Sequence, residues 1–519
     1  MRTHVRGTNN GSDRKLASPA GPGVGLAFAA IVLAMLPAVL DQTMLATGLP
    51  TIASDLGRLS DVSWIVTGYV IAAAAATPLW GKLGDRQGRK RMLEVALIAF
   101  LGASAVCGAA QDITWLIVAR VIQGTAAGGL MSLANAAVGD LVTPRERGRY
   151  QGYIVATFAV ATVAGPLLGG LLVDHASWRW VFYVNLPVGV AALAGLRLRF
   201  RAPVLERPRQ ALDALGAALL AAATSAFMLV CIWGGQRYAW GSPAIVSLVT
   251  AAALLSGALV WRERRAADPI VPLELLRTRT VAVASMALFL ATAALFSINI
   301  FVPLFLQTTT GATPTEAGLL LVPMMLGITF STTFAGRRIE RSGRYKRYPV
   351  AGLGLMTAAL AMLAALTGEP SRTSVLVAVA VFGLGFGMVG QVLIVAVQNG
   401  VDRRELGVAM AATSFFRAVG GAVGAAIFGA VFAARAGAAG AGAPLRALPQ
   451  GTQAHIVDAV QSVFLVATPI ALAGLLVVLL LRELPLRGPE RAPTRSAPAA
   501  AHVSIGQRER ELQSSTAGR

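Results

Sequence analysis

Gly81-Lys-Leu-Gly-Asp-Arg-Gln-Gly-Arg-Lys-Arg91 shares one pattern with Gly336-Arg-Arg-Ile-Glu-Arg-Ser-Gly-Arg-Tyr-Lys346, which lies 255 residues further along the chain. This single spacing aligns five positions: Gly81 with Gly336, Asp85 with Glu340, Arg86 with Arg341, Gly88 with Gly343 and Arg89 with Arg344. Glycine, acid and arginine that recur at fixed intervals indicate an internal repeat. Each copy follows an apolar segment, so the chain is predicted to contain two related halves of the same orientation.

The composition predicts a membrane protein. Of 519 residues, 55% are apolar and 13% are charged, and the mean hydropathy is +0.65. A soluble chain carries about 25% charged residues, so this chain lacks the polar surface that water requires. Its apolar residues form runs long enough to cross a hydrocarbon core about 30 Å thick. The fourteen runs are Val24–Leu49, Val62–Trp80, Met92–Ala110, Trp115–Val138, Tyr150–Val173, Val181–Leu196, Leu212–Trp233, Pro243–Trp261, Val281–Leu306, Ala317–Phe334, Pro349–Leu366, Val375–Val397, Gly407–Ala433 and Ile456–Leu481.

The positive charges predict how the chain lies in the membrane. If the N-terminus is cytoplasmic, 37 of the 45 Lys and Arg residues fall in cytoplasmic segments and six fall outside. Lys and Arg accumulate on the cytoplasmic side of membrane proteins, so both termini are predicted to be cytoplasmic. The net charge of +20 then reflects orientation and contact with anionic membrane lipids, and nucleic acid is not expected as a partner.

The predicted organisation is an all-α integral membrane protein in five parts. Residues 24–209 and 280–481 form two six-helix bundles, and residues 210–279 hold two inserted transmembrane helices and a basic loop. Residues 1–23 and 482–519 are polar or rich in Arg, Pro, Ala and Ser, and we expect disordered cytoplasmic tails there.

Several kinds of chemistry have no support in the sequence. Cys107 and Cys231 fall inside apolar runs without a nearby His, so neither a disulfide framework nor a metal site is expected. None of the four His residues lies deep in a run, and no nucleophile–base pair or phosphate-binding loop is visible. The chain is therefore not expected to be an enzyme or to be driven directly by ATP.

Four motifs carry a resemblance to a known family. They are Gly81–Arg91, Arg120-Val-Ile-Gln-Gly-Thr-Ala-Ala-Gly-Gly129, Gly165-Pro-Leu-Leu-Gly-Gly170 and Leu40-Asp-Gln-Thr-Met-Leu-Ala-Thr-Gly-Leu-Pro50. Together they resemble the fourteen-helix drug:proton antiporter branch of the major facilitator superfamily. The resemblance covers roughly residues 25–480 and implies the major facilitator fold, with the two inserted helices between its bundles.

Asp41 is the carboxylate that lies far from both ends of its predicted span. A charged Asp at mid-helix costs about 2.5–3.5 kcal/mol, so a functional role is expected. Arg120 lies within another span, and the resemblance implies a role in proton transfer for it. Our hypothesis is that Arg120 stabilises the charged form of Asp41 in one conformation and withdraws in another. The alternative is a permanent polar link, in which Asp41 is bonded to Thr43 or to another helix and Arg120 is bonded to helix carbonyls.

The repeated motif is predicted to act as a gate, in which Asp85 meets a helix N-terminus or an arginine of the other half. A solvated signal for membrane topology is the alternative. The candidate gating residues are Gly81, Asp85, Arg86, Gly88, Arg89, Gly336, Glu340, Arg341 and Gly343.

The antiporter motif consists of Gly165, Pro166, Gly169 and Gly170. Small residues let helices approach closely, and proline bends a helix. The resemblance implies that this motif closes the cavity against leak, and plain tight packing is the alternative.

A substrate cavity is expected to have apolar walls with few polar groups. Its candidate residues are Gln123, Phe158, Asn299, Gln391 and Arg417. Arg417 lies within a span whose half holds no comparably deep acid, and its partner is left open among Gln391, Gln398 and Asn299.

The function implied is proton-coupled antiport, in which lipophilic and cationic drugs or toxic metabolites leave across the cytoplasmic membrane. The proton gradient drives it without a cofactor, and a monomer is expected, with a small-molecule substrate, protons and membrane lipids as partners. With one deep acid, exchange of one proton for a monovalent cation is electroneutral. A dedicated exporter of a self-made antibiotic, siderophore, peptide or amino acid is one alternative. A membrane sensor or scaffold without transport is another, and the presence of Asp41 and Arg120 argues against it.

Overall fold

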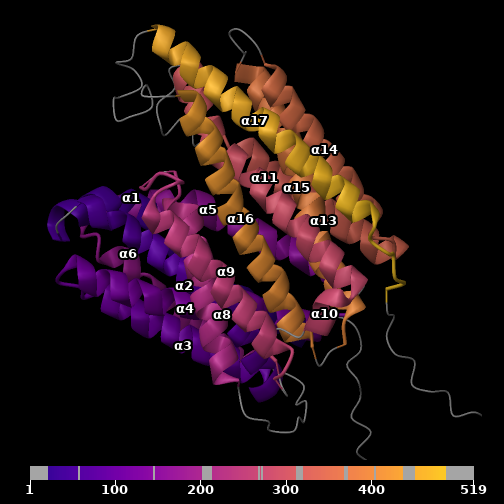
Figure 1. Ribbon diagram of the computed structural model, residues 1–519. Coiled ribbons are helices and arrows are strands. Elements are labelled where there is room, and N and C mark those ends of the chain that lie inside the picture. The colour runs from indigo at the N-terminus through magenta and orange to yellow at the C-terminus, as the bar shows by residue number, and fades with distance from the viewer. Residues whose placement is uncertain are drawn as a thin grey trace, which may run out of the picture. The chain divides into compact units, whose positions relative to one another are not determined.

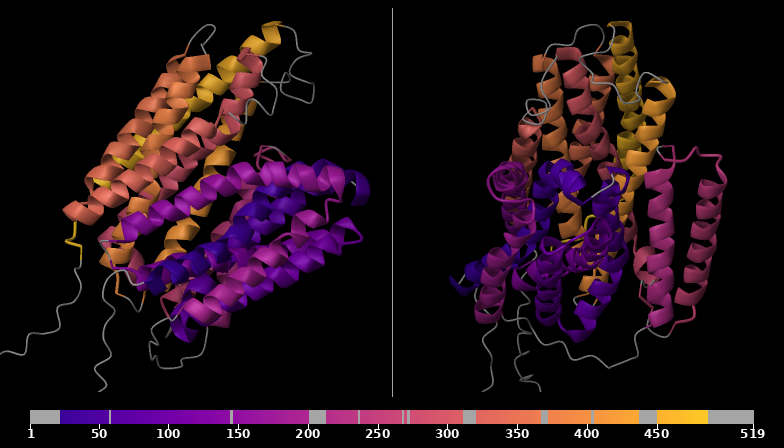
Figure 2. Two further views of the ribbon diagram at one scale, coloured as in Figure 1. Left: turned by 180° about the vertical axis from the view of Figure 1, so that it is seen from behind. Right: turned by 90° about the vertical axis from the view of Figure 1, so that its left-hand side faces the viewer.

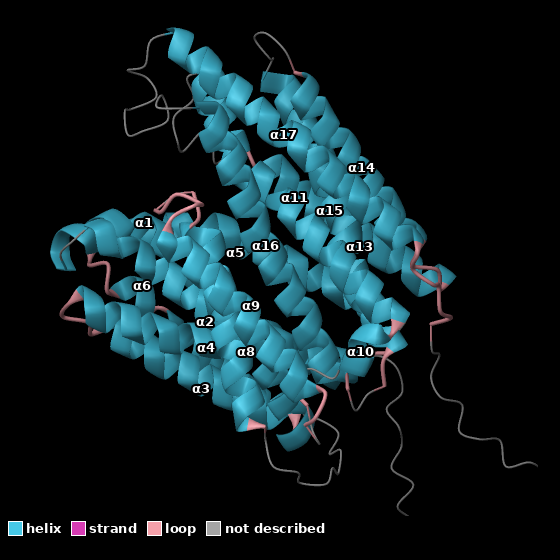
Figure 3. Ribbon diagram, in the orientation of Figure 1, coloured by secondary structure: helices cyan, strands magenta, loops and turns pink. Residues whose placement is uncertain are grey.

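The structure of the chain, a computed structural model, is helical throughout the part that it describes (Figures 1 and 3). The described residues are 22–56, 59–143, 146–200, 213–235, 237–266, 269–270, 273–310, 320–366, 372–402, 405–436 and 450–486. Within these ranges no β-strand occurs, and strand-like pairing is confined to one bridge between Gly234 and Tyr238. Helices satisfy their own backbone hydrogen bonds, which a hydrocarbon environment requires.

The first half of the chain forms the helices that correspond to the first six apolar runs. Their bounds are α1 Pro22–Leu56, α2 Leu59–Gln87, α3 Arg89–Gly108, α4 Ile113–Leu141, α5 Arg147–His175, α6 Trp180–Tyr183 and α7 Asn185–Arg199. The sixth predicted span is not continuous, because the single residue Val184 separates α6 from α7.

The inserted segment and the second half supply the remaining helices. Their bounds are α8 Ala214–Trp233, α9 Pro243–Glu263, α10 Leu273–Arg277, α11 Arg279–Thr310, α13 Val322–Ser342, α14 Arg347–Ala365, α15 Arg372–Gly400, α16 Leu406–Ala436 and α17 Gln450–Leu479. The short helix α10 is not anticipated by the apolar pattern, because it has only five residues.

Within the described ranges, thirteen segments are long and apolar enough to cross a membrane. The remaining predicted run, Ala317–Phe334, begins outside the described residues and corresponds to α13. The last turns of α13 carry Arg337, Arg338 and Arg341, which lower its mean hydropathy. α13 packs along α15 and α5, so it is part of the helical bundle like the other long helices. The all-α membrane architecture is confirmed.

The two halves pack their helices in equivalent pairs. α2 packs along α4 as α13 packs along α15, and α1 packs along α5 as α11 packs along α16. In the first two pairs, glycines bring the backbones together. The contacts are Gly124 with Tyr69, Gly128 with Ala73, Gly383 with Met324 and Gly387 with Ile328. The repeat read from the short motif therefore extends to the packing of whole helices.

The inserted helices α8 and α9 lie side by side (Figure 2). α8 also packs against α2 of the first half and α16 of the second half. The rings of Trp64 on α2 and Trp233 on α8 meet edge to face with their centroids 5.3 Å apart. The inserted pair is thus attached to both halves through α8.

Two boundaries differ from the sequence prediction. Gly81–Arg91 resembles a loop motif, but α2 continues to Gln87 and α3 begins at Arg89, so only Gly88 lies outside a helix. A tail was predicted from residue 482 onward, yet Glu483 Oε1 accepts the backbone N–H of Tyr345 over 2.7 Å, and Leu486 is buried. Polar composition alone does not reveal these contacts. The other residues of both predicted tails, apart from Pro22 and Gly23 at the start of α1, lie outside the described residues.

Asp213 is expected to stabilise the inserted pair. Its carboxylate accepts the backbone N–H of Gly216 at the start of α8 and the Nε–H of Arg262 on α9. The bond from Arg262 holds the pKa of Asp213 below its usual value. This contribution is therefore complete at neutral pH, above the unfolded pKa of about 3.9, and is lost as the pH falls through the lower folded pKa. Asp213→Ala is expected to cost about 1–2 kcal/mol at pH 7.

The measurement is thermal unfolding of the purified protein in detergent between pH 7 and pH 3. The difference in unfolding temperature between the wild type and Asp213→Ala should become smaller as the pH falls toward 3. The matched control is Asp174→Ala, which removes an exposed carboxylate at the end of α5. An equal loss in both variants contradicts the assignment.

Candidate functional site

Asp41 lies in the middle of α1 and is completely buried. Its Oδ2 atom accepts a hydrogen bond from Arg120 Nη1 of α4 over 2.5 Å, which forms an ion pair in the interior. Thr43 does not take this role, because its hydroxyl donates to backbone carbonyls of its own helix. The structure thus brings together the two charged residues that the sequence singled out.

Three polar side chains surround the ion pair. Gln123 donates from Nε2 to Asp41 Oδ1 over 3.0 Å and accepts from Arg120 over 2.7 Å. Asn185 donates from Nδ2 to Asp41 Oδ1 over 3.2 Å and to Ser104 Oγ over 3.0 Å. We call Asp41, Ser104, Arg120, Gln123 and Asn185 the aspartate network. Removal of one member of a buried ion pair costs about 3–5 kcal/mol, so these bonds tie together four helices, α1, α3, α4 and α7.

The aspartate network includes residues that the sequence analysis missed. Asn185 is the first residue of α7, and Ser104 lies near the C-terminal end of α3. The centroid of the Tyr69 ring lies 4.1 Å from the guanidinium carbon of Arg120. The sequence analysis did not predict this cation–π contact either. An asparagine within the apolar run Val181–Leu196 was the available signal for one of these residues.

The antiporter motif packs α5 onto α1 next to Asp41. A Cβ atom at Gly165 would overlap the hydroxyl of Thr43, and one at Gly169 would lie 2.7 Å from the carbonyl oxygen of Met44. Gly170 has open space around it, and Pro166 is exposed. Two of the four motif residues therefore make the close approach.

Asp85 joins α2 to the N-terminus of α16. Its two carboxylate oxygens accept the backbone N–H groups of Gly407 over 3.0 Å and Val408 over 2.9 Å. These N–H groups belong to the first turn of α16, where a helix has no internal acceptors and carries a partial positive charge. Arg89 binds Asp85 over 2.9 Å and also pairs with Asp140 of α4. We call this arrangement the α2–α16 contact.

Glycine permits this approach. A Cβ atom at Gly81 would lie 2.5 Å from the Cβ of Ala411 and 2.6 Å from the carbonyl oxygen of Gly407. Gly88 has a φ of 95°, a conformation that side chains with a Cβ rarely adopt, and it turns the chain from α2 into α3. Arg86 is half-buried beside them.

The second copy of the motif makes a weaker contact, between α13 and α5. Gly336 lies against the backbone of Gly148, and Glu340 pairs with Arg149 over 3.4 Å. Both charged side chains are more than a quarter exposed, whereas Asp85 is fully buried. Gly343 repeats the role of Gly88, with a φ of 69° at the end of α13. The two copies share geometry but differ in burial.

Four helices surround a cavity of about 150 Å³, which we call the Arg417 cavity. α5 contributes Val155, Phe158, Ala159 and Thr162, α13 contributes Met325, Ile328, Thr329 and Thr332, and α15 and α16 contribute Phe386, Gly387, Gly390, Gln391 and Arg417. Phe158, Gln391 and Arg417 were predicted from the sequence to line a cavity. Gln123 instead belongs to the aspartate network, and Asn299 is exposed on α11. Neither lines this cavity.

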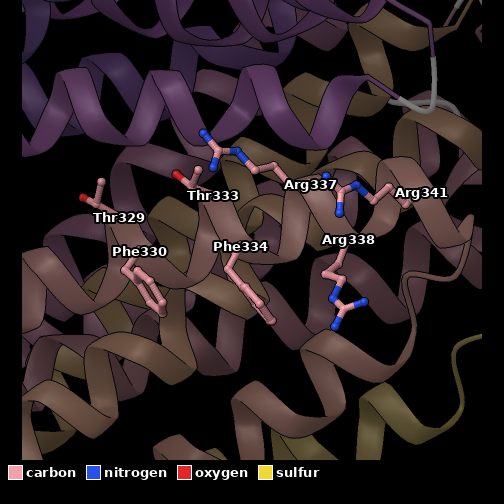
Figure 4. Close-up of a pocket in the computed structure, with 7 residues that line it drawn as sticks. All are labelled: Thr329, Phe330, Thr333, Phe334, Arg337, Arg338 and Arg341. Carbon is pink, nitrogen blue, oxygen red and sulfur yellow. The ribbon is translucent and has the colours of Figure 1, made fainter.

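A second, more open hollow of about 440 Å³ follows one face of α13 (Figure 4). Phe330 and Phe334 stack there with their ring centroids 6.2 Å apart, and Arg337, Arg338 and Arg341 continue the same face. Arg341 therefore lies in an exposed basic and aromatic surface, whereas its repeat counterpart Arg86 is half-buried.

Helices of membrane-spanning length in two equivalent halves, with a buried acid–base network in one half and a cavity where the halves meet, define a membrane transporter. The chain belongs to the Major Facilitator Superfamily, whose family profile matches residues 31–425. The family and the fold that the sequence motifs suggested are thereby confirmed.

Several relatives share much of the chain. A transporter of the same superfamily from Mycobacterium tuberculosis is 38% identical over 479 residues, which cover 88% of this chain and 69% of the relative. Multidrug transporter protein MdtP of Bacillus subtilis is 33% identical and covers 79% of this chain and 76% of its own length. Among solved structures, the human organic anion transporter MFSD10 superposes with a TM-score of 0.62 at 16% identity, with coverage of 88% of this chain and all of that chain. The last likeness concerns the fold alone.

Asp85→Ala is expected to open the α2–α16 contact. It removes two charge-assisted hydrogen bonds, each worth about 1.5–3 kcal/mol, so the population of molecules in which α2 and α16 are in contact should fall at least tenfold. Spin labels at the exposed positions Gln87 and Glu405 report the separation of the two helices by double electron–electron resonance. The control is Glu340→Gln, which breaks a partly exposed pair worth about 0–1 kcal/mol and should change the distances little. An unchanged distance distribution in Asp85→Ala contradicts the assignment.

Proposed function

We propose that this transporter is a secondary antiporter that takes up protons and exports lipophilic small molecules across the cytoplasmic membrane, with both termini in the cytoplasm. The observation that carries the proposal is the aspartate network. Among the described residues, Asp41 is the carboxylate that is completely buried far from both ends of its helix, and an arginine holds it. Intramembrane carboxylates that pair with a cation are typical of proton pathways.

The ion pair gives Asp41 two chemical states. With Arg120 in contact, the carboxylate is stabilised as an anion. When Arg120 moves away, the apolar surroundings disfavour the charge, and the carboxyl group takes up a proton. Each state therefore favours a different arrangement of α1 and α4, which couples proton binding to a conformational change.

α5 connects this change to the cavity. Thr162 lines the Arg417 cavity, and Gly165, less than one turn further along, packs against Thr43 close to Asp41. A cargo molecule in the cavity and a proton on Asp41 therefore act on positions of α5 that lie less than one turn apart. Their competition for the position of α5 is the proposed basis of exchange.

The α2–α16 contact provides the proposed gate. It joins the two halves through backbone groups at the start of α16, so it must break when the halves separate at this end. The contact between Glu340 and Arg149 is the second, weaker part of the same gate.

The names of the relatives support export of more than one compound. Two Bacillus subtilis relatives are named as multidrug proteins, and each is at least 32% identical over more than three quarters of this chain. A second candidate function is export of one self-made product. A relative from Aspergillus aculeatus, 34% identical over 70% of this chain, is named as the transporter of the acurin A biosynthesis cluster. Efflux of many unrelated compounds from cells that express the chain favours the first function over the second.

Asp41→Asn is expected to reduce transport driven by a pH gradient at least tenfold, because an amide cannot carry the proton. Exchange of cargo in both directions without a gradient should remain. The measurement uses proteoliposomes with an acidic lumen, ethidium and 2-naphthalenesulfonate as trial cargoes, and a lumenal dye that reports alkalinisation.

Asp174→Asn is the matched control, because it makes the same chemical change at an exposed position on α5. It should transport like the wild type. Full gradient-driven transport by Asp41→Asn, or no proton movement with any cargo in the wild type, would exclude the antiporter.

A further inference from the structure

Arg417 is a charged group inside the second half, and no residue that the structure describes pairs with it. It is partly buried on α16, about 16 Å along the helix axis from Leu406. No hydrogen bond or ion pair links it to another residue in the described ranges. Neither Gln398, whose Nε2 donates to the carbonyl of Asn135, nor Asn299, which is exposed, is bonded to Arg417 in the described ranges.

A structural role would leave Arg417 bonded to backbone carbonyls. Arg147 shows what such a role requires, since its guanidinium donates to the carbonyl of Gln398 over 2.8 Å and to that of Gly139 over 2.5 Å. An arginine without such bonds is costly in a medium of low polarity. This cost indicates that Arg417 is positioned to bind a ligand rather than another group of the protein.

The Arg417 cavity has the lining that a small amphipathic anion requires. Its thirteen lining residues include no Asp or Glu, so nothing in the wall compensates the positive charge. The amide oxygen Oε1 of Gln391 is buried there without a partner, which leaves this amide available to a bound molecule. Phe158 and Phe386 supply aromatic wall, and a cavity of about 150 Å³ is large enough for one benzene ring.

The repeat shows that this charge is particular to one half. Gly169 approaches Met44 as Gly424 approaches Ala293, and Gly124 approaches Tyr69 as Gly383 approaches Met324. These equivalent contacts relate Asp41 to Leu290, Arg120 to Val379 and Thr162 to Arg417. The first half therefore holds a balanced ion pair, whereas the second half holds one positive charge where its counterpart has a neutral threonine.

We infer that Arg417 binds the anionic group of the cargo, and that the transported class is amphipathic monoanions such as aromatic sulfonates and carboxylates. The inference rests on the proposed transport function and adds the charge of the cargo and the residue that selects it. The planar guanidinium forms two parallel hydrogen bonds with a sulfonate or carboxylate, and the phenylalanines cover the ring. A cation in the same cavity meets an uncompensated like charge. This class differs from the cationic cargo expected from the sequence.

The charge of the cargo has a consequence for energetics. Entry of one proton and exit of one monoanion move two positive charges inward in each cycle. The membrane potential, negative inside, then drives export together with the pH gradient. Exchange of one proton for a monocation moves no net charge, so a dependence on voltage separates the two classes of cargo.

The test uses three probes that share one ring system and carry permanent or absent charge. They are benzenesulfonate, neutral benzenesulfonamide and cationic phenyltrimethylammonium. Calorimetric titration of the full-length protein in lipid nanodiscs should show that the wild type binds the sulfonate at least tenfold more tightly than the other two. Arg417→Gln should remove this preference, and Arg417→Lys should retain most of it.

The control variant is Arg435→Gln, which neutralises an exposed arginine on the same helix and should leave all three affinities unchanged. The preference of the wild type tests the proposal even if Arg417→Gln does not fold. Equal or tighter binding of the ammonium probe by the wild type, or an unchanged sulfonate preference in a folded Arg417→Gln protein, overturns the proposal.

Transport in proteoliposomes separates this proposal from the proposed function. Sulfonate export should accelerate when a potassium diffusion potential makes the side from which it leaves negative. Proton-coupled transport of the ammonium probe without sulfonate binding overturns the Arg417 site and leaves the antiporter standing. Sulfonate binding that depends on Arg417, without proton movement for any probe, overturns the antiporter and leaves the Arg417 site standing.

Discussion

The ion pair between Asp41 and Arg120 is the interaction on which the first half of the molecule depends. Both groups are fully buried, and each would destabilise the fold without the other, because an unpaired charge in this environment costs several kcal/mol. The pair therefore fixes α1 against α4, and the amides of Gln123 and Asn185 extend the same constraint to α7. These bonds join α1, α4 and α7 in one buried polar cluster around Asp41.

Glycine residues determine how closely the other helices pack around this ion pair. Gly165 and Gly169 bring α5 onto α1 within a few residues of Asp41, and Gly81 brings α2 onto α16. Each approach depends on the absence of a Cβ atom, so the helices lie at backbone distance and small shifts of one are felt by its neighbour. The network, the cavity and the α2–α16 contact are thereby linked through packed backbone.

The sequence predicted the architecture well because the architecture follows from average properties. Fourteen apolar runs correspond to helices, and the repeated motif indicated the relation between the halves. Asp41, Arg120 and Arg417 were visible because a charge within an apolar run stands out.

The arrangement of the site was less accessible from the sequence. Asn185 bonds to Asp41 because α7 packs against α1, and an apolar pattern does not record which way a polar residue within a span faces. The different burial of Asp85 and Glu340 depends on which helices pack together. The sequences of the two similar motifs therefore did not predict which acid is buried. The assignment of Gln123 to a cavity failed for the same reason, since a polar residue in a span gives no direction.

The inserted pair of helices has a consequence for the movement of the two halves. α8 contacts α2 and α16 through apolar side chains, among them Ile71, Met228 and Val419, while α9 remains largely uncovered. Because α2 and α16 belong to different halves, α8 cannot stay fixed to both when they move apart. The contact that α8 makes with both halves is apolar in the part of the chain that the structure describes, so it contains no directional bond that would hold α2 and α16 at one fixed distance.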